Sequence, residues 1–142
     1  MSARIEDLDP IFQPIARAIL AEAQRRIEAV SPGSRILPAV TWRTPADQEA
    51  AVASGASILK IGFHNFGRAL DVKVLDERGA YVIDGEDPRY TIFGQVAKER
   101  GCVWGGDWHR ADWDHCELCG GFTVSEFLAW LDAHPHPIEE RR

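Results

Sequence analysis

Apolar residues recur at helical spacing over residues 9–30, and arginine and glutamate residues fall between them. This pattern predicts an amphipathic helix that ends before Ser31-Pro32-Gly33, because proline and glycine interrupt helices. Helix-start signals, in which threonine or aspartate precedes the first turn, predict three more helices. These are expected at residues 44–55, 87–100 and 124–133.

Short runs rich in valine and isoleucine predict the strands. Residues 36–42 and 69–75 are the clearest, and residues 81–83 are expected to pair with the second run as a hairpin. Residues 102–122 mix short apolar runs with several glycines, which predicts brief strands joined by tight turns. Helices and strands mix without a regular βαβ repeat, so the predicted fold class is α+β.

The chain of 142 residues is predicted to form a single domain, because it is long enough to bury a core and contains no repeat or linker. The core of this domain is expected over about residues 35–133. A mobile tail is expected at residues 134–142, which are rich in proline and charge. A monomer is expected.

The formal net charge of −6 argues against nucleic acid as a partner. No run approaches the roughly eighteen apolar residues of a membrane span, so membrane insertion is not expected. The first residues lack a basic segment followed by an apolar one, so no secretion signal is predicted and a cytoplasmic location is expected. An odd number of cysteines, Cys102, Cys116 and Cys119, argues against a disulfide framework.

Two segments carry the residues of a candidate metal site. His64 and Asp71 are separated by a glycine that permits a turn between them. His115 lies in the second segment, where Asp112 and Asp114 precede it. Two histidines and a carboxylate suit a catalytic zinc ion, and another carboxylate beside the bound water can move protons. The sequence therefore predicts a catalytic zinc site.

Two rival cation sites weaken on inspection. Cys102, Cys116 and Cys119 form a possible Cys₃His zinc centre with His115. This alternative is disfavoured because it removes His115 from the catalytic set and makes two adjacent residues joint ligands. The acidic turn at residues 84–87 has too few ligands for a recognised Ca²⁺ loop, so a solvated turn is expected there.

The chain reads His64-x-x-Gly67-x-Ala69-x-Asp71, then Trp104-Gly105-Gly106-Asp107-Trp108, then Asp112-x-x-His115. This succession resembles the zinc peptidases of bacterial cell walls. That family comprises D-alanyl-D-alanine carboxypeptidases, vancomycin-resistance dipeptidases and phage L-alanyl-D-glutamate endolysins. The resemblance covers roughly residues 35–130. It implies the hedgehog and D,D-peptidase-like fold, in which helices flank a small antiparallel sheet.

The resemblance also implies roles for individual residues. His64, Asp71 and His115 would bind one Zn²⁺ per chain, and Asp112 would act as the general base. Arg43 matches an upstream arginine that binds the substrate and stabilises charge at the scissile carbonyl in the family.

Further substrate contacts are expected from Gln48, Trp108 and His109, although solvent exposure is the stronger alternative for His109. Asp114 is a weaker candidate for the base than Asp112, because neighbouring residues of a strand point to opposite faces.

Two departures from the family pattern stand out. Gly62 occupies the position of a serine in the family, so a hydrogen bond near the first histidine is either missing or supplied by another group. The spacing from Trp108 to Asp112 is one residue shorter than in the endolysin-like pattern, which leaves the register of the base open.

The predicted function is that of a zinc-dependent, endolysin-like peptidase that hydrolyses peptidoglycan stem peptides at the L-Ala–D-Glu bond. Two alternatives stay open: a D-Ala-D-Ala carboxypeptidase or dipeptidase acting on wall fragments, and a non-catalytic zinc-binding relative. With no predicted export signal, the chain resembles a phage or prophage endolysin held in the host cytoplasm until it is released to the wall.

Overall fold

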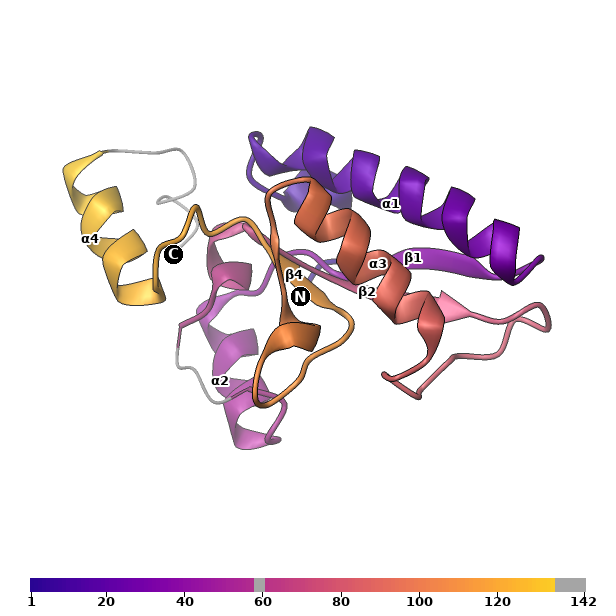
Figure 1. The fold of residues 1–142 in the computed structure, drawn as a ribbon. Coiled ribbons are helices and arrows are strands. Elements are labelled where there is room, and N and C mark those ends of the chain that lie inside the picture. The colour runs from indigo at the N-terminus through magenta and orange to yellow at the C-terminus, as the bar shows by residue number, and fades with distance from the viewer. Residues whose placement is uncertain (58–60, 135–142) are drawn as a thin grey trace.

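The computed structural model describes residues 1–57 and 61–134 (Figure 1). Its α-helices are α1 (Phe12–Val30), α2 (Pro45–Ala53), α3 (Pro88–Glu99) and α4 (Val124–Ala133). Its strands are β1 (Arg35–Val40), β2 (Ala69–Leu75), β3 (Val103–Trp104) and β4 (His115–Glu117). Three short 3₁₀ helices are η1 (Ile5–Asp7), η2 (Phe63–Phe66) and η3 (Gly105–Asp107). The predicted tail from residue 135 onward lies outside the described residues.

The four strands form one antiparallel sheet in the order β1-β2-β4-β3. β2 therefore lies in the interior of the sheet, between the long strand β1 and the short strand β4. An irregularity between Pro38 and Val40 shifts the register of β1 against β2. The small antiparallel sheet with flanking helices confirms the predicted α+β class.

The main core lies between the sheet and the helices α1 and α3, which run side by side over it (Figure 1). The apolar face predicted for the first helix is buried there, and Phe12, Ile19 and Ile27 have no exposed surface. From the sheet, Val72 and Val74 fill the same core. Burial of these aliphatic and aromatic groups stabilises the position of β2 in the sheet.

A second, smaller cluster joins α4 to η2. Phe127 and Leu131 of the helix pack against Phe63 and Phe66 of the 3₁₀ turn. α4 begins at a capping box in which Thr123 accepts a hydrogen bond from the backbone of Glu126. The second cluster thus holds η2, which carries His64, against the end of β2.

One predicted boundary is wrong, and one predicted pairing forms only in part. The first helix begins at Phe12 rather than residue 9, because Asp9 is fully buried in an ion pair with Arg68 and its backbone N–H donates to Gly67. The hairpin predicted for residues 81–83 consists of an isolated antiparallel bridge between Leu75 and Tyr81 and a hydrogen bond from the Val82 N–H to the Val74 carbonyl at 2.9 Å. Among the described residues, no helix combines the length and apolar character needed to cross a bilayer.

Candidate functional site

Asp71 and His115 face each other across the interior of the sheet. β2 and β4 pair so that Asp71 is the direct register partner of His115. Residues opposite each other in an antiparallel pair project to the same face, so their side chains meet. The Nδ1 atom of His115 lies 2.7 Å from Oδ1 of Asp71.

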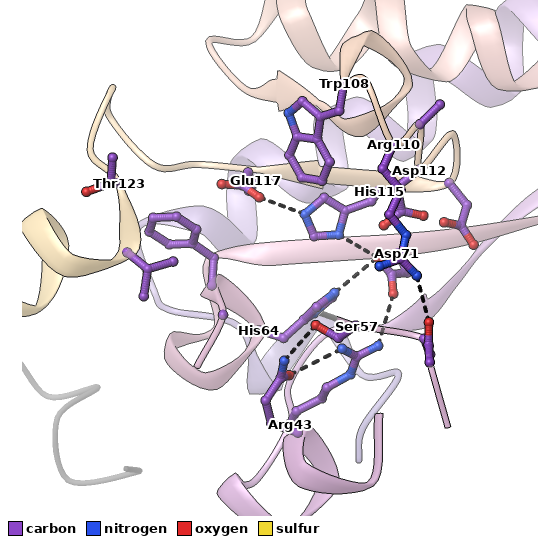
Figure 2. Close-up of a pocket in the computed structure, with 18 of the residues that line it drawn as sticks. Arg43, Ser57, His64, Asp71, Trp108, Arg110, Asp112, His115, Glu117 and Thr123 are labelled. Carbon is purple, nitrogen blue, oxygen red and sulfur yellow. Dashed lines mark hydrogen bonds and ion pairs between the residues drawn. The ribbon is translucent and has the colours of Figure 1, made fainter. Parts of the chain in front are cut away.

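His64 reaches the same oxygen from η2. Its Nε2 atom lies 3.0 Å from Oδ1 of Asp71 (Figure 2). The approach depends on Gly67, which ends η2 at a φ of 66°, a left-handed conformation that glycine adopts without strain. The ligand atoms of His64, Asp71 and His115 all lie within 4.8 Å of one another. The structure thus brings together the three metal ligands predicted from the sequence.

This convergence places two imidazole rings against one carboxylate oxygen. Although burial would raise the pKa of Asp71, the charges of His64 and His115 and their hydrogen bonds hold it well below its usual range. Burial would lower the pKa of His115, but hydrogen bonds with Asp71 and Glu117 raise it to about 10. Two imidazole nitrogens and one carboxylate oxygen at a single point form a donor set that suits Zn²⁺. The residues present therefore fit the ion.

The two histidines differ in what holds their other ring nitrogen. Nε2 of His115 lies 2.9 Å from Oε1 of Glu117, a residue that the sequence reasoning missed. Nδ1 of His64 is buried and has no hydrogen-bond partner in the described part of the chain. Gly62, which stands where the family has a serine, offers no side chain here. The hydrogen bond left open by this departure is thus not supplied by another described residue.

Arg43 enters the site from the segment before α2. Its Nη2 atom lies 3.7 Å from Oδ2 of Asp71, on the side away from the histidines. Its Nη1 atom donates to Oε1 of Gln48 at 3.3 Å, and Nε2 of Gln48 donates to Ser57 at 3.1 Å (Figure 2). Gln48 is only 1% exposed. We therefore expect Gln48 to orient Arg43, while its predicted contact with substrate stays a prediction.

These groups border a cavity of about 670 Å³. One wall is aromatic, with Trp108 and Phe122 among its lining residues. Trp108 is 39% exposed, and its ring centroid lies 5.2 Å from that of the His115 ring. Arg110 crosses the cavity and donates to the Gly55 carbonyl at 2.7 Å. His109 is exposed and does not line the cavity, as its alternative interpretation held.

Both aspartates before His115 line the cavity, so the expectation that Asp114 points away is wrong. The carboxylates of Asp71, Asp112 and Asp114 lie within 4.8 Å of one another. The reason is local, because Asp114 belongs to a turn just before β4 and the alternation of a strand does not apply there. Burial, followed by the charge of Asp71 and a hydrogen bond with Asp112, raises the pKa of Asp114 to about 8.

The Trp-Gly-Gly motif is structural at its first residue. Trp104 is buried in the main core, and its Nε1 atom donates to the Trp113 carbonyl at 2.8 Å. Its indole lies against Gly94 of α3 and Gly106, where a Cβ atom would overlap the ring. Gly105 in turn lies against the backbone of Asp112. The motif therefore sets the path of the segment that carries the candidate base.

The rival cysteine centre is not formed. Cys102 and Cys116 pack in the main core, whereas Cys119 packs in the second cluster with α4. All three are free thiols, and the ring nitrogens of His115 face carboxylates instead. In the described part of the chain, no group of potential metal ligands includes a cysteine or the acidic turn at residues 84–87.

A protein-family model and a solved structure are similar to this chain. The family model described as D-alanyl-D-alanine carboxypeptidase matches residues 59–118, which include the three candidate ligands and both nearby aspartates. The solved structure of the Serratia marcescens L-Ala D-Glu endopeptidase ChiX is similar, with a TM-score of 0.59 and 22% sequence identity. This likeness covers 87% of this chain and 86% of that chain. A comparison with curated proteins gave no match. The family resemblance and the predicted fold are thereby confirmed.

Proposed function

We propose that this chain is a zinc-dependent peptidase that hydrolyses peptidoglycan stem peptides, with the L-Ala–D-Glu bond as its target. The proposal depends on one observation above all: His64, Asp71 and His115 converge on one point in a cavity that Arg43 and Asp112 also line. The matched family model, and the similarity to a structure described as an L-Ala D-Glu endopeptidase, support the same class of reaction.

His64, Asp71 and His115 would hold the ion through Nε2, Oδ1 and Nδ1, the atoms that meet in the structure. Zinc in such a site polarises a carbonyl and lowers the pKa of bound water to about 7. Asp112 is exposed to the cavity, where it would take the proton of the attacking water and return it to the leaving amine.

Arg43 would stabilise the negative charge that develops on the scissile carbonyl oxygen. Its guanidinium is mostly buried and held by Gln48, so little conformational entropy is lost when it binds an anion. The arginine also lies beside Asp71, which places its charge next to the proposed metal site rather than at the rim. This position is consistent with the role that the family resemblance implies.

The rest of the cavity suits an anionic peptide. Arg43 and Arg110 both line it, and a guanidinium binds a carboxylate with two parallel hydrogen bonds. Stem peptides carry carboxylates on their D-amino acids. Trp108 and Phe122 would cover the less polar part of such a peptide. Arg110 now donates to a neutral carbonyl, so a substrate carboxylate would be a stronger partner for it.

The second candidate function is removal of a terminal D-Ala, which the description of the matched family model favours. The two activities give different products. Cleavage at L-Ala–D-Glu frees the stem peptide from the glycan, whereas carboxypeptidase action shortens the stem by one residue. The non-catalytic alternative leaves muropeptides intact. A host-cytoplasmic location before release, a phage or prophage origin and a monomeric state stay predictions.

The test is mass spectrometry of purified muropeptides after incubation with the zinc-loaded protein. We expect free stem peptides without N-terminal L-Ala, and no such product from the Asp112→Asn variant, which keeps the size of the side chain and removes its basicity. Release of D-Ala alone would favour the second function. Intact muropeptides with the zinc-loaded wild type would contradict both peptidase functions.

A further inference from the structure

His115 lies between two carboxylates, one on each ring nitrogen. Nδ1 faces Oδ1 of Asp71 at 2.7 Å, and Nε2 faces Oε1 of Glu117 at 2.9 Å (Figure 2). An imidazole can bind a cation only through a nitrogen that carries no proton, so the position of the remaining proton decides which nitrogen is available. The hydrogen-bond partner of Nε2 therefore influences whether Nδ1 is free to bind a metal.

The backbone places Glu117 where its carboxylate can accept a hydrogen bond from the Nε2–H of His115. His115 and Glu117 are two residues apart in β4, so their side chains project to the same face of the sheet. Glu117 ends β4, an interior strand of the sheet, and is paired with Ala69 of β2 on one side and Val103 of β3 on the other. Its side chain is only 13% exposed, and within residues 1–57 and 61–134 the ion pair found for it is with His115.

The other contacts of His115 do not determine which of its ring nitrogens carries the proton. Trp108 packs beside the ring at a centroid distance of 5.2 Å, which restrains the plane of the imidazole but offers no acceptor. Asp71 meets both histidines through one oxygen atom and is itself a candidate ligand. Glu117 is the carboxylate that faces His115 from outside the proposed ligand set.

We propose that Glu117 is a positioning residue that keeps the proton of His115 on Nε2 and so presents the Nδ1 lone pair to the metal. The proposal rests on the zinc site of the proposed function but not on which bond is cleaved. His64 is held differently, because its Nδ1 atom has no partner among the described residues. The zinc affinity should therefore depend on Glu117 more than on any hydrogen bond to His64.

The experiment compares zinc affinity in two variants by competition with a chromophoric chelator. Glu117→Gln keeps an oxygen that can accept a hydrogen bond from the Nε2–H of His115, whereas Glu117→Met has a similar size and no such acceptor. We expect Glu117→Met to bind zinc about 10–100-fold more weakly than wild type, the usual effect of losing a hydrogen bond to a ligand. Glu117→Gln should retain most of the affinity.

The control is Glu86→Met, which removes the same charge from an exposed turn outside the cavity and should leave zinc affinity unchanged. Nitrogen-15 NMR of the imidazoles supplies a readout independent of activity. In the zinc-loaded wild type we expect the Nε2 of His115 to be protonated and its Nδ1 to be metal-bound.

Unchanged zinc affinity in Glu117→Met, equal weakening in Glu117→Gln and Glu117→Met, or coordination through Nε2 of His115 would each overturn the proposal. If Glu117→Met fails to fold, the wild-type spectrum and the affinity of Glu117→Gln still decide it. The proposed function fails separately. Zinc affinity that depends on Glu117 in a protein that cleaves no muropeptide would refute the peptidase and leave this inference standing.

Discussion

Gly105 and Asp112 are in direct contact, and this contact sets where the candidate base lies. The Asp112 N–H donates to the Gly105 carbonyl at 2.8 Å. A Cβ atom on Gly105 would overlap the Asp112 carbonyl oxygen and come within 3.0 Å of its Cβ. Glycine at this position is therefore required by close packing rather than by backbone conformation, since its φ is not positive.

We expect Gly105→Ala to displace the segment around Asp112. Overpacking of this kind typically costs about 1–3 kcal/mol of stability, and the proposed base would move with the backbone. Muropeptide turnover should fall at least about tenfold, since displacement of a catalytic group by about 1 Å can cost far more. Thermal unfolding and turnover are the measurements. Gly62→Ala is the steric control, because its Cβ would make only an ordinary contact at 3.7 Å with Gln48. A Gly105→Ala protein with wild-type turnover would show that this contact does not position the base.

Arg43→Ala should lower turnover by about 10²–10³-fold, the typical effect of losing one group that stabilises an oxyanion. Zinc content should survive, because Arg43 lies 3.7 Å from Asp71 but is not one of the proposed ligands. Arg43→Lys keeps the charge without the planar fork and should recover only part of the activity. Metal analysis alongside turnover separates the two effects. Loss of zinc together with activity would assign Arg43 a role in holding Asp71 instead.

Asp112 and Asp114 can be distinguished by conservative replacement. We expect Asp112→Asn to reduce turnover by about 10²–10⁴-fold, the usual range for loss of a general base, and Asp114→Asn to reduce it much less. The reason is that Asp112 is exposed to the cavity, whereas Asp114 is partly buried and its raised pKa favours the neutral acid. Both variants must be compared at full zinc occupancy. A large loss confined to Asp114→Asn would reverse the assignment.

Asp114 should also make the metal-free protein less stable as the pH rises. Its pKa is raised from 3.8 to about 8, so folding favours the protonated form. The stability gained in that form is complete below the unfolded pKa and is lost as the pH passes through the folded value. His115, raised from 6.5 to about 10, acts in the same direction at higher pH.

The measurement is the free energy of unfolding of the metal-free protein between about pH 5 and about pH 9. Asp114→Asn cannot ionise, so its stability should fall less steeply over this window than that of the wild type. Identical slopes in the two proteins would rule out a buried, largely neutral Asp114. Excess zinc should weaken the effect, because a nearby cation favours the ionised carboxylate.

Zinc binding should require the histidines and not the cysteines. We expect His64→Ala and His115→Ala each to lose the bound zinc equivalent, because each removes one of three ligands. A Cys102→Ser, Cys119→Ser double variant should retain it, since these thiols pack in separate apolar clusters. Elemental analysis after dialysis is sufficient. Retention of zinc by His64→Ala, with loss in both His115→Ala and the cysteine variant, would revive the Cys₃His alternative.

Local signals in the sequence determined most of the elements. The Thr123 capping box and the Pro45 and Pro88 helix starts act within one turn of chain, so α2, α3 and α4 begin where predicted. The apolar run over residues 69–75 likewise predicted β2, whose bounds in the structure are the same. The convergence of His64, Asp71 and His115 was also predicted, because these residues match a motif of the family that the sequence resembles.

Only the tertiary structure decided the contacts whose geometry does not follow from the spacing of residues in the sequence. The turn before β4 brings Asp114 into the cavity against the expected alternation, and the register of β2 with β4 sets His115 opposite Asp71. Glu117 reaches His115 because both share one face of a strand too short to be located from pattern alone. The spacing of apolar residues in a sequence indicates whether a segment is a helix or a strand, whereas these contacts depend on how separate segments pack together.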